Sequence, residues 1–321
     1  MSANKISIII PTFNRSNDLE ITLKEVLPML NQINEILIID QSTNQKTKDL
    51  IGEINEPKIK YIFNSPPSIT LARNKGIESV SKESNIIIFL DDDVSIGCNY
   101  FQEVTRVFND HPEAKAVAGF NKPEKSNRIE NTLKKIFLLG YLESDPEARI
   151  ISAYGNTYPA NLNSVMTAQW LPGVNMAYRS DVLTTQRFDQ NLLGYTLAED
   201  IDFTYRLYKR HPNSLFITPF ANLTHRASVT ERAPTERMSY INQVDHFYFF
   251  FKNLNTSILN RIKFIWSLLG ISALRTLNMI IRPTKSNYLK WKYFFKSLWY
   301  CLFHISDIKQ GNVRNFPNQK I

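Results

Sequence analysis

The chain has 321 residues, with 38 basic and 30 acidic side chains (a net charge of +8), 43% apolar residues, 10 Gly, 15 Pro and 2 Cys. This composition is typical of a globular protein and excludes collagen-like, low-complexity and disulfide-rich chains. The length allows one large domain or one domain with an appendage. The first apolar run, residues 6–10, is too short for a signal-peptide core, so we expect a cytoplasmic protein.

The first hundred residues alternate short apolar runs with helical patterns, which predicts βαβ units and a mostly parallel sheet. The runs are continuously apolar, as in strands that helices cover on both faces. We expect strands at residues 6–10, 36–39, 59–63 and 86–90, and helices near residues 19–30, 47–54, 69–80 and 100–108.

Beyond residue 120 the pattern weakens, and scattered Pro and Asn residues predict a loop-rich insertion around a short helix at 131–139. A strand at 174–178, a helix at 197–209 and a strand at 215–218 follow. We therefore expect a catalytic domain over residues 1–240 and a helical C-terminal region over residues 241–321.

Three consecutive carboxylates, Asp91, Asp92 and Asp93, directly follow the fourth predicted strand. Like charges this close raise one another's pKa unless a cation lies among them. In an open α/β sheet, ligands gather outside the carboxyl ends of the strands, and oxygen ligands suit Mg²⁺ or Mn²⁺. The sequence predicts a divalent-metal site here, against the alternative of a solvated acidic turn.

A second acidic cluster, Glu199, Asp200 and Asp202, opens a predicted helix. Acids in a first turn commonly compensate the helix dipole, which explains Asp202 well. A loop that delivers two adjacent carboxylates is also how a general base is presented to a cleft, which explains Glu199 and Asp200 better.

Other polar residues belong to the same sheet edge. Residues 11–15 (Pro-Thr-Phe-Asn-Arg) follow the first strand and Asp40 follows the second, while Arg73 and Lys75 lie in the third predicted helix. The two cations are able to reach a phosphate group. Each segment alone is typical of a turn or of an exposed surface, but all of them are expected at the same edge of the predicted sheet.

The chain resembles the family-2 glycosyltransferases with the GT-A fold, of the bacterial polysaccharide or glycolipid type, over about residues 5–230. Six segments carry the resemblance in order: Pro-Thr-Phe-Asn-Arg, Asp-Gln-Ser-Thr, Ala-Arg-Asn-Lys-Gly, Leu-Asp-Asp-Asp-Val, Leu-Pro-Gly-Val-Asn-Met and Ala-Glu-Asp-Ile-Asp-Phe. Gln41 departs from the pattern, since the family often has a second Asp there. The expected fold is α/β, a GT-A-like mostly parallel sheet flanked by helices, with a C-terminal helical region.

The resemblance implies an inverting, metal-dependent transfer of a sugar from a nucleotide-diphosphate donor, a UDP-sugar above all, to a hydroxyl of a glycan or lipid-linked glycan. It implies Asp200 as the general base, with Glu199 as the alternative. Asp93 and Asp91 would bind Mn²⁺ or Mg²⁺, with His225 as a further candidate ligand. The implied donor-binding residues are Pro11, Thr12, Asn14, Arg15, Asp40, Arg73, Asp91, Asp92, Gly173, Asn175 and Trp170.

Two of these residues have an equally plain structural interpretation. A single histidine such as His225 is more often structural than a ligand. Trp170 would stack on a sugar ring or pack in the core.

The C-terminal region is basic and aromatic. Residues 241–321 hold twelve Lys/Arg against two acids, a net charge of +10, so the preceding residues carry −2. A helix over residues 288–305 would place Trp291, Phe295 and Leu298 on one arc and Lys290 on another, as in helices that lie on a membrane surface. Residues 262–281 are long enough to span a membrane but contain Lys263, Arg275 and Asn278, so spanning, surface and buried placements stay open.

These features predict an enzyme at the inner face of the cell membrane, with no nucleic-acid partner and a homo-oligomer as an open possibility. The alternatives are a helical cover or dimer interface for the tail, a nucleotidylyltransferase-like sugar-nucleotide enzyme, and an inactive membrane-surface scaffold. A nucleotidylyltransferase would need a Gly-rich loop after the first strand, and residues 11–15 contain no Gly.

Overall fold

The computed structural model describes residues 4–124, 127–144, 147–228 and 233–317. The chain forms two compact units, each described here by itself. The sheet unit comprises residues 1–123, 161–190 and 199–232, and the helical unit comprises residues 124–160, 191–198 and 233–321. The expected division at residue 240 into a catalytic and a C-terminal domain stays a prediction.

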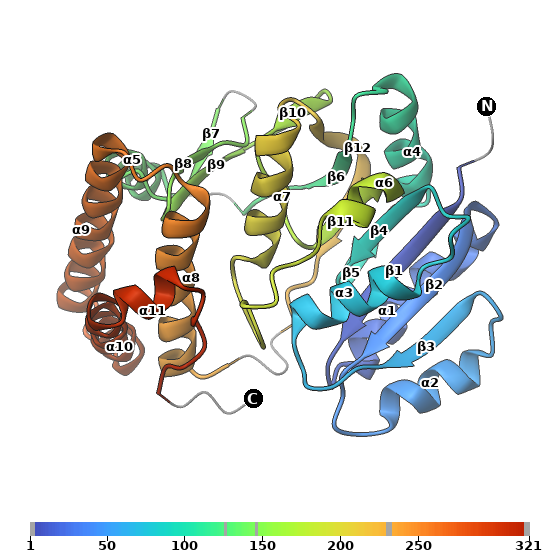
Figure 1. Ribbon diagram of the computed structural model, residues 1–321, viewed down its shortest axis with the longest axis horizontal. Helices are drawn as coiled ribbons and strands as arrows, with labels where there is room; N and C mark the ends of the chain where they lie inside the picture. The colour runs from blue at the N-terminus through green and yellow to red at the C-terminus, as the bar shows by residue number, and fades with distance from the viewer. Residues whose placement is uncertain (1–3, 125–126, 145–146, 229–232, 318–321) are drawn as a thin grey trace. The chain divides into compact units, whose positions relative to one another are not determined.

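A mixed sheet organises the sheet unit (Figure 1). Among the described residues, its strand order is β10-β12-β6-β11-β4-β1-β2-β3, with β5 paired to β12. Six strands run in one direction: β1 (Ile6–Thr12), β2 (Ile33–Asp40), β3 (Ile59–Phe63), β4 (Ile86–Leu90), β6 (Ala116–Asn121) and β12 (Leu215–His225). Three run the opposite way: β5 (Val94–Ile96), β10 (Met166–Ala168) and β11 (Asn175–Arg179).

Helices cover both faces of this sheet, as the continuous apolar strands predict. Leu19, Leu23 and Phe101 pack with Ile8 and Ile10 on one face. On the other face helix α3 approaches β1 closely, and Phe89 contacts Phe188. The helices are α1 (Ser16–Val26), η1 (Leu27–Gln32), α2 (Lys46–Ile54), α3 (Ile69–Ser79), α4 (Tyr100–Asp110), α6 (Ser180–Thr185) and α7 (Glu199–Arg210).

The helical unit contains a small sheet in the order β7-β9-β8 and five helices among the described residues. Its core is aromatic: Phe250 stacks on Phe264, and Tyr154 stacks on His246. Its elements are α5 (Arg128–Ile136), β7 (Tyr141–Glu143), β8 (Ile150–Ser152), β9 (Gly155–Pro159), α8 (Thr235–Asn253), α9 (Ile258–Ile281), α10 (Lys285–Phe303) and α11 (Ile305–Lys309).

The predicted α/β fold with a mostly parallel sheet and helical C-terminal region is confirmed, and several element bounds are corrected. The first helix ends at Val26, and Pro28 opens a 3₁₀ segment in its place. The expected loop-rich insertion contains three short strands. The strand expected at 215–218 continues to His225, because its second half pairs with β5.

Candidate active site

The Asp triplet forms a tight turn between β4 and β5, at the carboxyl end of a central strand. Asp92 points inward: its side chain is buried and accepts a hydrogen bond from Thr12 Oγ1 at 2.7 Å. Arg15 Nη1 lies 3.4 Å from its other oxygen. Burial raises the pKa of Asp92 to about 7. Asp92 therefore ties the turn to β1 and the loop that follows it.

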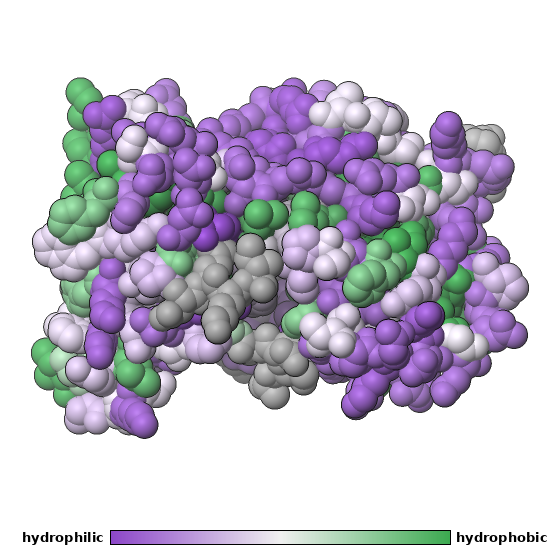
Figure 2. Space-filling model, turned by 60° about the horizontal axis from the view of Figure 1, so that its bottom comes forward, coloured by the Kyte–Doolittle hydropathy of each residue, from purple (hydrophilic) through white to green (hydrophobic). Residues whose placement is uncertain are grey.

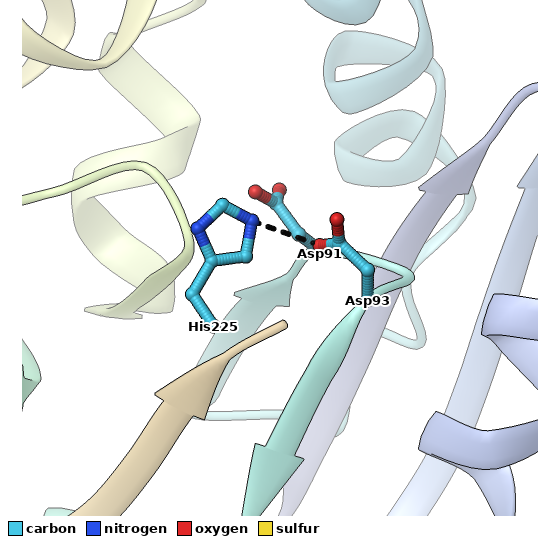
Figure 3. A group of neighbouring side chains, drawn as sticks. All are labelled: Asp91, Asp93 and His225. Atoms are coloured by element: carbon cyan, nitrogen blue, oxygen red, sulfur yellow. Dashed lines mark ion pairs between the residues drawn. The ribbon is translucent and has the colours of Figure 1, made fainter. Parts of the chain in front are cut away.

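Asp91 and Asp93 of this turn form a second group with His225, which lies at the end of β12 (Figure 3). Each offers one ligand atom, and these atoms all lie within 4.8 Å of one another. His225 is delivered by the register of β12, in which it faces Val94. Its Nε2 lies 3.0 Å from Asp93 Oδ1.

The electrostatics of this group favour a cation. Burial, the largest single influence, raises the pKa of Asp93, but the hydrogen bond and charge of His225, the hydrogen bond from Ser228 N and the charge of Arg15 together outweigh it, so the pKa is lowered overall. The hydrogen bond between His225 and Asp93 raises the pKa of His225. Two carboxylates and one imidazole are a ligand set that Mn²⁺ accepts, so these residues fit a divalent metal.

Arg73 joins this group to the second acidic cluster. Its guanidinium is almost fully buried. Nη1 donates to Glu199 Oε1 at 3.0 Å, and Nη2 donates to Gly173 O at 3.2 Å and to Asp91 Oδ1 at 3.4 Å. Because these hydrogen bonds reach Glu199 on one side and Asp91 on the other, Arg73 holds the two acidic clusters together.

Asp200 lies in the first turn of α7 and is oriented by the backbone. Its Oδ2 accepts a hydrogen bond from Gly173 N at 2.7 Å, and its Oδ1 accepts one from Ile201 N at 2.7 Å. Burial raises the pKa of both Asp200 and Glu199, and the negative charge of Asp200 raises that of Glu199 further, while Arg73 opposes these shifts. Such a pair holds a proton more readily than ordinary carboxylates do.

The loops after β1 and β2 form one network. Asn14, at a positive φ of 55°, accepts a hydrogen bond from Thr43 N at 3.0 Å, and its N–H donates to Ser42 Oγ at 2.8 Å. Asp40 accepts hydrogen bonds from Ser42 N and from Tyr61 Oη, both at 2.9 Å. An open hollow of about 420 Å³ lies against these loops, lined by Asn14, Arg15, Ser16, Asn17, Asp18, Thr43, Asn44 and Lys46.

Three residues expected to bind the donor are buried or half-buried in the structure. Pro11 is a buried residue within β1. Asn175 is fully buried, and its side chain exchanges hydrogen bonds with the backbone N–H and C=O of Gly119, so it fastens β11 to β6. Trp170 is half-buried. Their donor-binding roles stay predictions.

Arg226 is a contributor that the sequence pattern did not single out. Its guanidinium donates to Val94 O at 2.6 Å, Ser95 Oγ at 2.9 Å and Thr22 Oγ1 at 2.8 Å. These contacts fasten the end of β12 to α1 and to the Asp turn. Its position next to His225 was the only signal available in the sequence.

The fold is that of the GT-A sugar transferases, as two solved structures show. The mannosyltransferase PcManGT from Pyrobaculum calidifontis, solved with GDP-Man and Mn²⁺, superposes with a TM-score of 0.53 at 12% identity, over 93% of this chain and 87% of that one. Glucosyl-3-phosphoglycerate synthase from Mycobacterium tuberculosis, solved with Mn²⁺ and UDP, gives a TM-score of 0.53 at 13% identity over 80% and 82% of the two chains.

The sequence matches Glycosyl transferase family 2 over residues 7–228, and the chain belongs to this family. It is 31% identical over 93 residues to the GalNAc(5)-diNAcBac-PP-undecaprenol beta-1,3-glucosyltransferase of Campylobacter jejuni, covering 28% of this chain and 29% of that protein. It is 23% identical over 175 residues to glycosyltransferase GlyA of Streptococcus pneumoniae, covering 50% and 25%. The chain thus spans between a quarter and a third of the length of these two relatives. The expected class, a glycosyltransferase, is confirmed.

Proposed function

We propose that the chain transfers a sugar from a nucleotide-diphosphate donor to a hydroxyl of a glycan or lipid-linked glycan, with inversion at the anomeric carbon. The observation that carries this proposal is the buried Arg73, which joins a metal-compatible group through Asp91 to the carboxylate pair through Glu199. In this proposal one guanidinium holds the residues assigned to the leaving group and to the base at a set distance from each other.

For the donor, we favour a UDP-sugar, because solved relatives of the same fold carry UDP or a GDP-sugar. Thr12, Asn14, Arg15 and Asp40 line or support the loops that would hold the base and ribose. Arg73 would act on the donor indirectly, by orienting Asp91.

For the metal, Asp91, Asp93 and His225 are the proposed ligands of Mn²⁺, with Mg²⁺ as the alternative. A divalent cation bound there supplies positive charge that stabilises a diphosphate leaving group. Arg226 keeps the end of β12, and with it His225, beside the turn.

For the base, we propose Asp200. The backbone N–H groups of Gly173 and Ile201 orient its carboxylate, whereas Glu199 is engaged by Arg73. Asp200 would accept the proton of the acceptor hydroxyl as that oxygen attacks the anomeric carbon. One base and one leaving group on opposite sides of that carbon give a single displacement, which inverts it.

The competing functions are less well supported. A nucleotidylyltransferase needs a Gly-rich loop after β1, and residues 13–17 there are Phe-Asn-Arg-Ser-Asn. An inactive scaffold would not need to keep the carboxylates of Asp91, Asp93 and Asp200 close together, since like charges this close raise one another's pKa and oppose ionisation.

The direct test measures donor binding and turnover together. UDP-sugars and GDP-mannose are screened with Mn²⁺ for thermal stabilisation, and UDP or GDP release is then measured for the sugar that stabilises most. Asp200→Asn should bind that donor as the wild type does but release nucleotide roughly 10²–10⁴-fold more slowly. Normal turnover by this variant would contradict the assignment of the base.

The proposed cellular place is the inner face of the membrane, with helix α9 as the contact. Among the described residues α9 alone has the length and hydropathy of a membrane span. Its inner side packs within the helical unit, where Ser267 hydrogen-bonds Ser152 and Gly270 lies against Phe137. Figure 2 shows that hydrophobic patches lie between hydrophilic ones on the surface of the molecule. The outer side of α9 exposes nine apolar side chains: Ile258, Leu259, Ile262, Ile265, Trp266, Leu269, Leu277, Ile280 and Ile281.

We therefore propose that α9, rather than the predicted helix α10, contacts the membrane. On α10, Phe294 is buried and Trp291 donates a hydrogen bond to Thr276 Oγ1 at 3.1 Å, so part of its apolar arc packs inside the helical unit. Because α9 packs along one side, we propose that it lies in the plane of the membrane rather than crossing it.

Sedimentation with anionic liposomes tests this placement. Ile265→Asp with Leu269→Asp should abolish sedimentation, because two charges would enter the apolar stripe. The matched control is Ile129→Asp, at an exposed position of α5 in the same unit. Equal sedimentation of both variants would contradict the proposal, and dimerisation lost only in the double variant would make the stripe a contact between copies.

A further inference from the structure

Phe188 lies where three elements of the sheet unit meet. Its ring is almost fully buried and stacks on Phe203 of α7, with the ring centroids 4.3 Å apart. It also meets Phe89 of β4 edge to face, at a centroid distance of 5.4 Å. The guanidinium of Arg73, on α3, lies over the same ring, with its Cζ 5.2 Å from the centroid. One side chain therefore contacts α3, α7 and β4.

Each of these three elements carries a part of the proposed site. Strand β4 leads directly into the turn with Asp91, and α7 begins with Glu199 and Asp200. Helix α3 carries Arg73, whose guanidinium joins Asp91 to Glu199. All of these residues belong to the sheet unit. Because Phe188 touches all three elements, its ring lies where it can set the position of the guanidinium between the two acidic clusters.

Hydrogen bonds hold the backbone around Phe188 in place. The side chain of Asn74, the residue after Arg73, donates to Phe188 O and accepts from Phe188 N, both at 2.9 Å. Just before it in the chain, Gln186 Nε2 donates to Phe203 O at 2.6 Å. The segment 186–188 is thus fastened to α3 by Asn74 and to α7 by Gln186, so the ring has a fixed place between the two helices.

An aromatic ring suits this place because the guanidinium is buried. The face of an aromatic ring attracts a cation, and the attraction is stronger where the cation is removed from water. In the part of the chain that the structure describes, Arg73 Nε has no hydrogen-bond partner, so Nη1 and Nη2 carry the hydrogen bonds of this side chain. The ring therefore supplies the buried charge with a contact besides its hydrogen bonds.

We propose that Phe188 is a positioning residue for the sugar-transfer reaction: its ring holds the Arg73 guanidinium between the two acidic clusters. The inference rests on the proposed roles of Asp91 and Asp200. The hydrogen bond from Arg73 to Glu199, at 3.0 Å, is shorter than that to Asp91, at 3.4 Å. A loosened guanidinium should therefore disturb the start of α7, which carries the proposed base, more than it disturbs donor binding.

Turnover and donor binding separate this role from simple packing. Phe188→Leu removes the ring and keeps an apolar side chain. With Mn²⁺ and a saturating amount of the stabilising UDP-sugar or GDP-mannose, nucleotide release should fall roughly 10–100-fold, because a displacement of about 1 Å can cost about 10²-fold in rate. Donor affinity, measured by calorimetry, should change less than about 3-fold.

The matched control is Phe108→Leu in α4. Phe108 is buried to nearly the same degree as Phe188, and the guanidinium of Arg179 lies over its ring at 5.1 Å. Arg179 pairs with Ile86, at the opposite end of β4 from Asp91. The control therefore loses the same kind of contact away from the site and should keep its turnover. Equal rates for the two variants would overturn the proposal.

A double-variant cycle with Arg73→Met shows whether Phe188 acts through Arg73. If it does, Phe188→Leu should slow the Arg73→Met enzyme by less than about 2-fold, whereas losses that multiply would overturn the proposal. Slow turnover by Arg73→Met with normal turnover by Phe188→Leu would overturn this inference alone. Normal turnover by Arg73→Met would overturn the proposed role of Arg73 as well.

A second variant covers the case in which Phe188→Leu fails to fold. Asn74→Ala keeps the ring and releases the backbone of Phe188, so it should still lower turnover several-fold. Unchanged turnover by Asn74→Ala would overturn the proposal.

Discussion

Replacing Gly173 with Ala would move the proposed base without removing it. A Cβ built on Gly173 lies 2.9 Å from Asp200 Oδ2 and 3.1 Å from Asp200 Cβ, whereas ordinary contacts begin at 3.4 Å. The carboxylate must therefore shift by about 0.5 Å. The 2.7 Å hydrogen bond from Gly173 N would be weakened by this shift.

The shift of the carboxylate and the weaker hydrogen bond should both lower turnover. A hydrogen bond to a charged group contributes about 1.5–3 kcal/mol, so its partial loss is worth about 1–2 kcal/mol. Each 1.36 kcal/mol of barrier is tenfold in rate, so we expect nucleotide release to slow roughly 5–30-fold. Donor affinity, measured by calorimetry with Mn²⁺, should stay within about 3-fold, because the loops after β1 and β2 are untouched.

The control is Gly52→Ala, in helix α2 of the same unit, where a Cβ meets nothing within 4 Å. That change should leave turnover unaltered and raise stability by up to about 1 kcal/mol through helix propensity. Wild-type turnover by Gly173→Ala would show that the position of Asp200 is unimportant and would refute the assignment.

Three further changes have defined outcomes. Asp93→Ala should remove most of the Mn²⁺-dependent part of nucleotide binding, and calorimetry that gives equal affinities for both proteins with Mn²⁺ present, or equal wild-type affinities with Mn²⁺ and with chelator, would contradict this. Gly76→Ala should cost about 1–3 kcal/mol in denaturant unfolding, because its Cβ would lie 2.4 Å from Ile9 Cγ2. Glu35→Gln should cost about 1–3 kcal/mol at pH 7, since Glu35 is buried and bonded to Ser7 and Lys60. Although burial opposes ionisation, these partners lower the pKa of Glu35 overall, so its stabilisation is full above pH 4.5 and should disappear as pH falls through the folded-state pKa.

The strands of the sheet were predictable because their cause is local. A buried parallel strand must be apolar on both faces, and the bounds of β4 follow from that requirement alone. The carboxyl edge was predictable for the same reason, since Asp40 and Asp91 follow such runs directly. Sequence patterns of this kind need no knowledge of distant partners.

The extension of β12 was not predictable in this way. Residues 219–225 include Pro219 and alternate polar with apolar side chains, and they continue the strand because they pair with β5 and, at Leu223, with Asn121 of β6. That pairing brings His225 opposite Val94, 131 positions earlier in the chain. The sequence thus singled out His225 as a candidate metal ligand, but it did not show that His225 lies beside Asp91 and Asp93.

The three acids at the start of α7 show how the structure divides one sequence pattern into separate roles. Asp202 pairs with Arg206 one turn later at 2.9 Å, an interaction within the helix. Glu199 pairs with Arg73, 126 positions away, which no local pattern could reveal. Asp200 instead receives backbone N–H groups from Gly173 and Ile201. Neutral donors orient a carboxylate without cancelling its charge, and a carboxylate that is fixed in place but still able to take up a proton is what a general base requires.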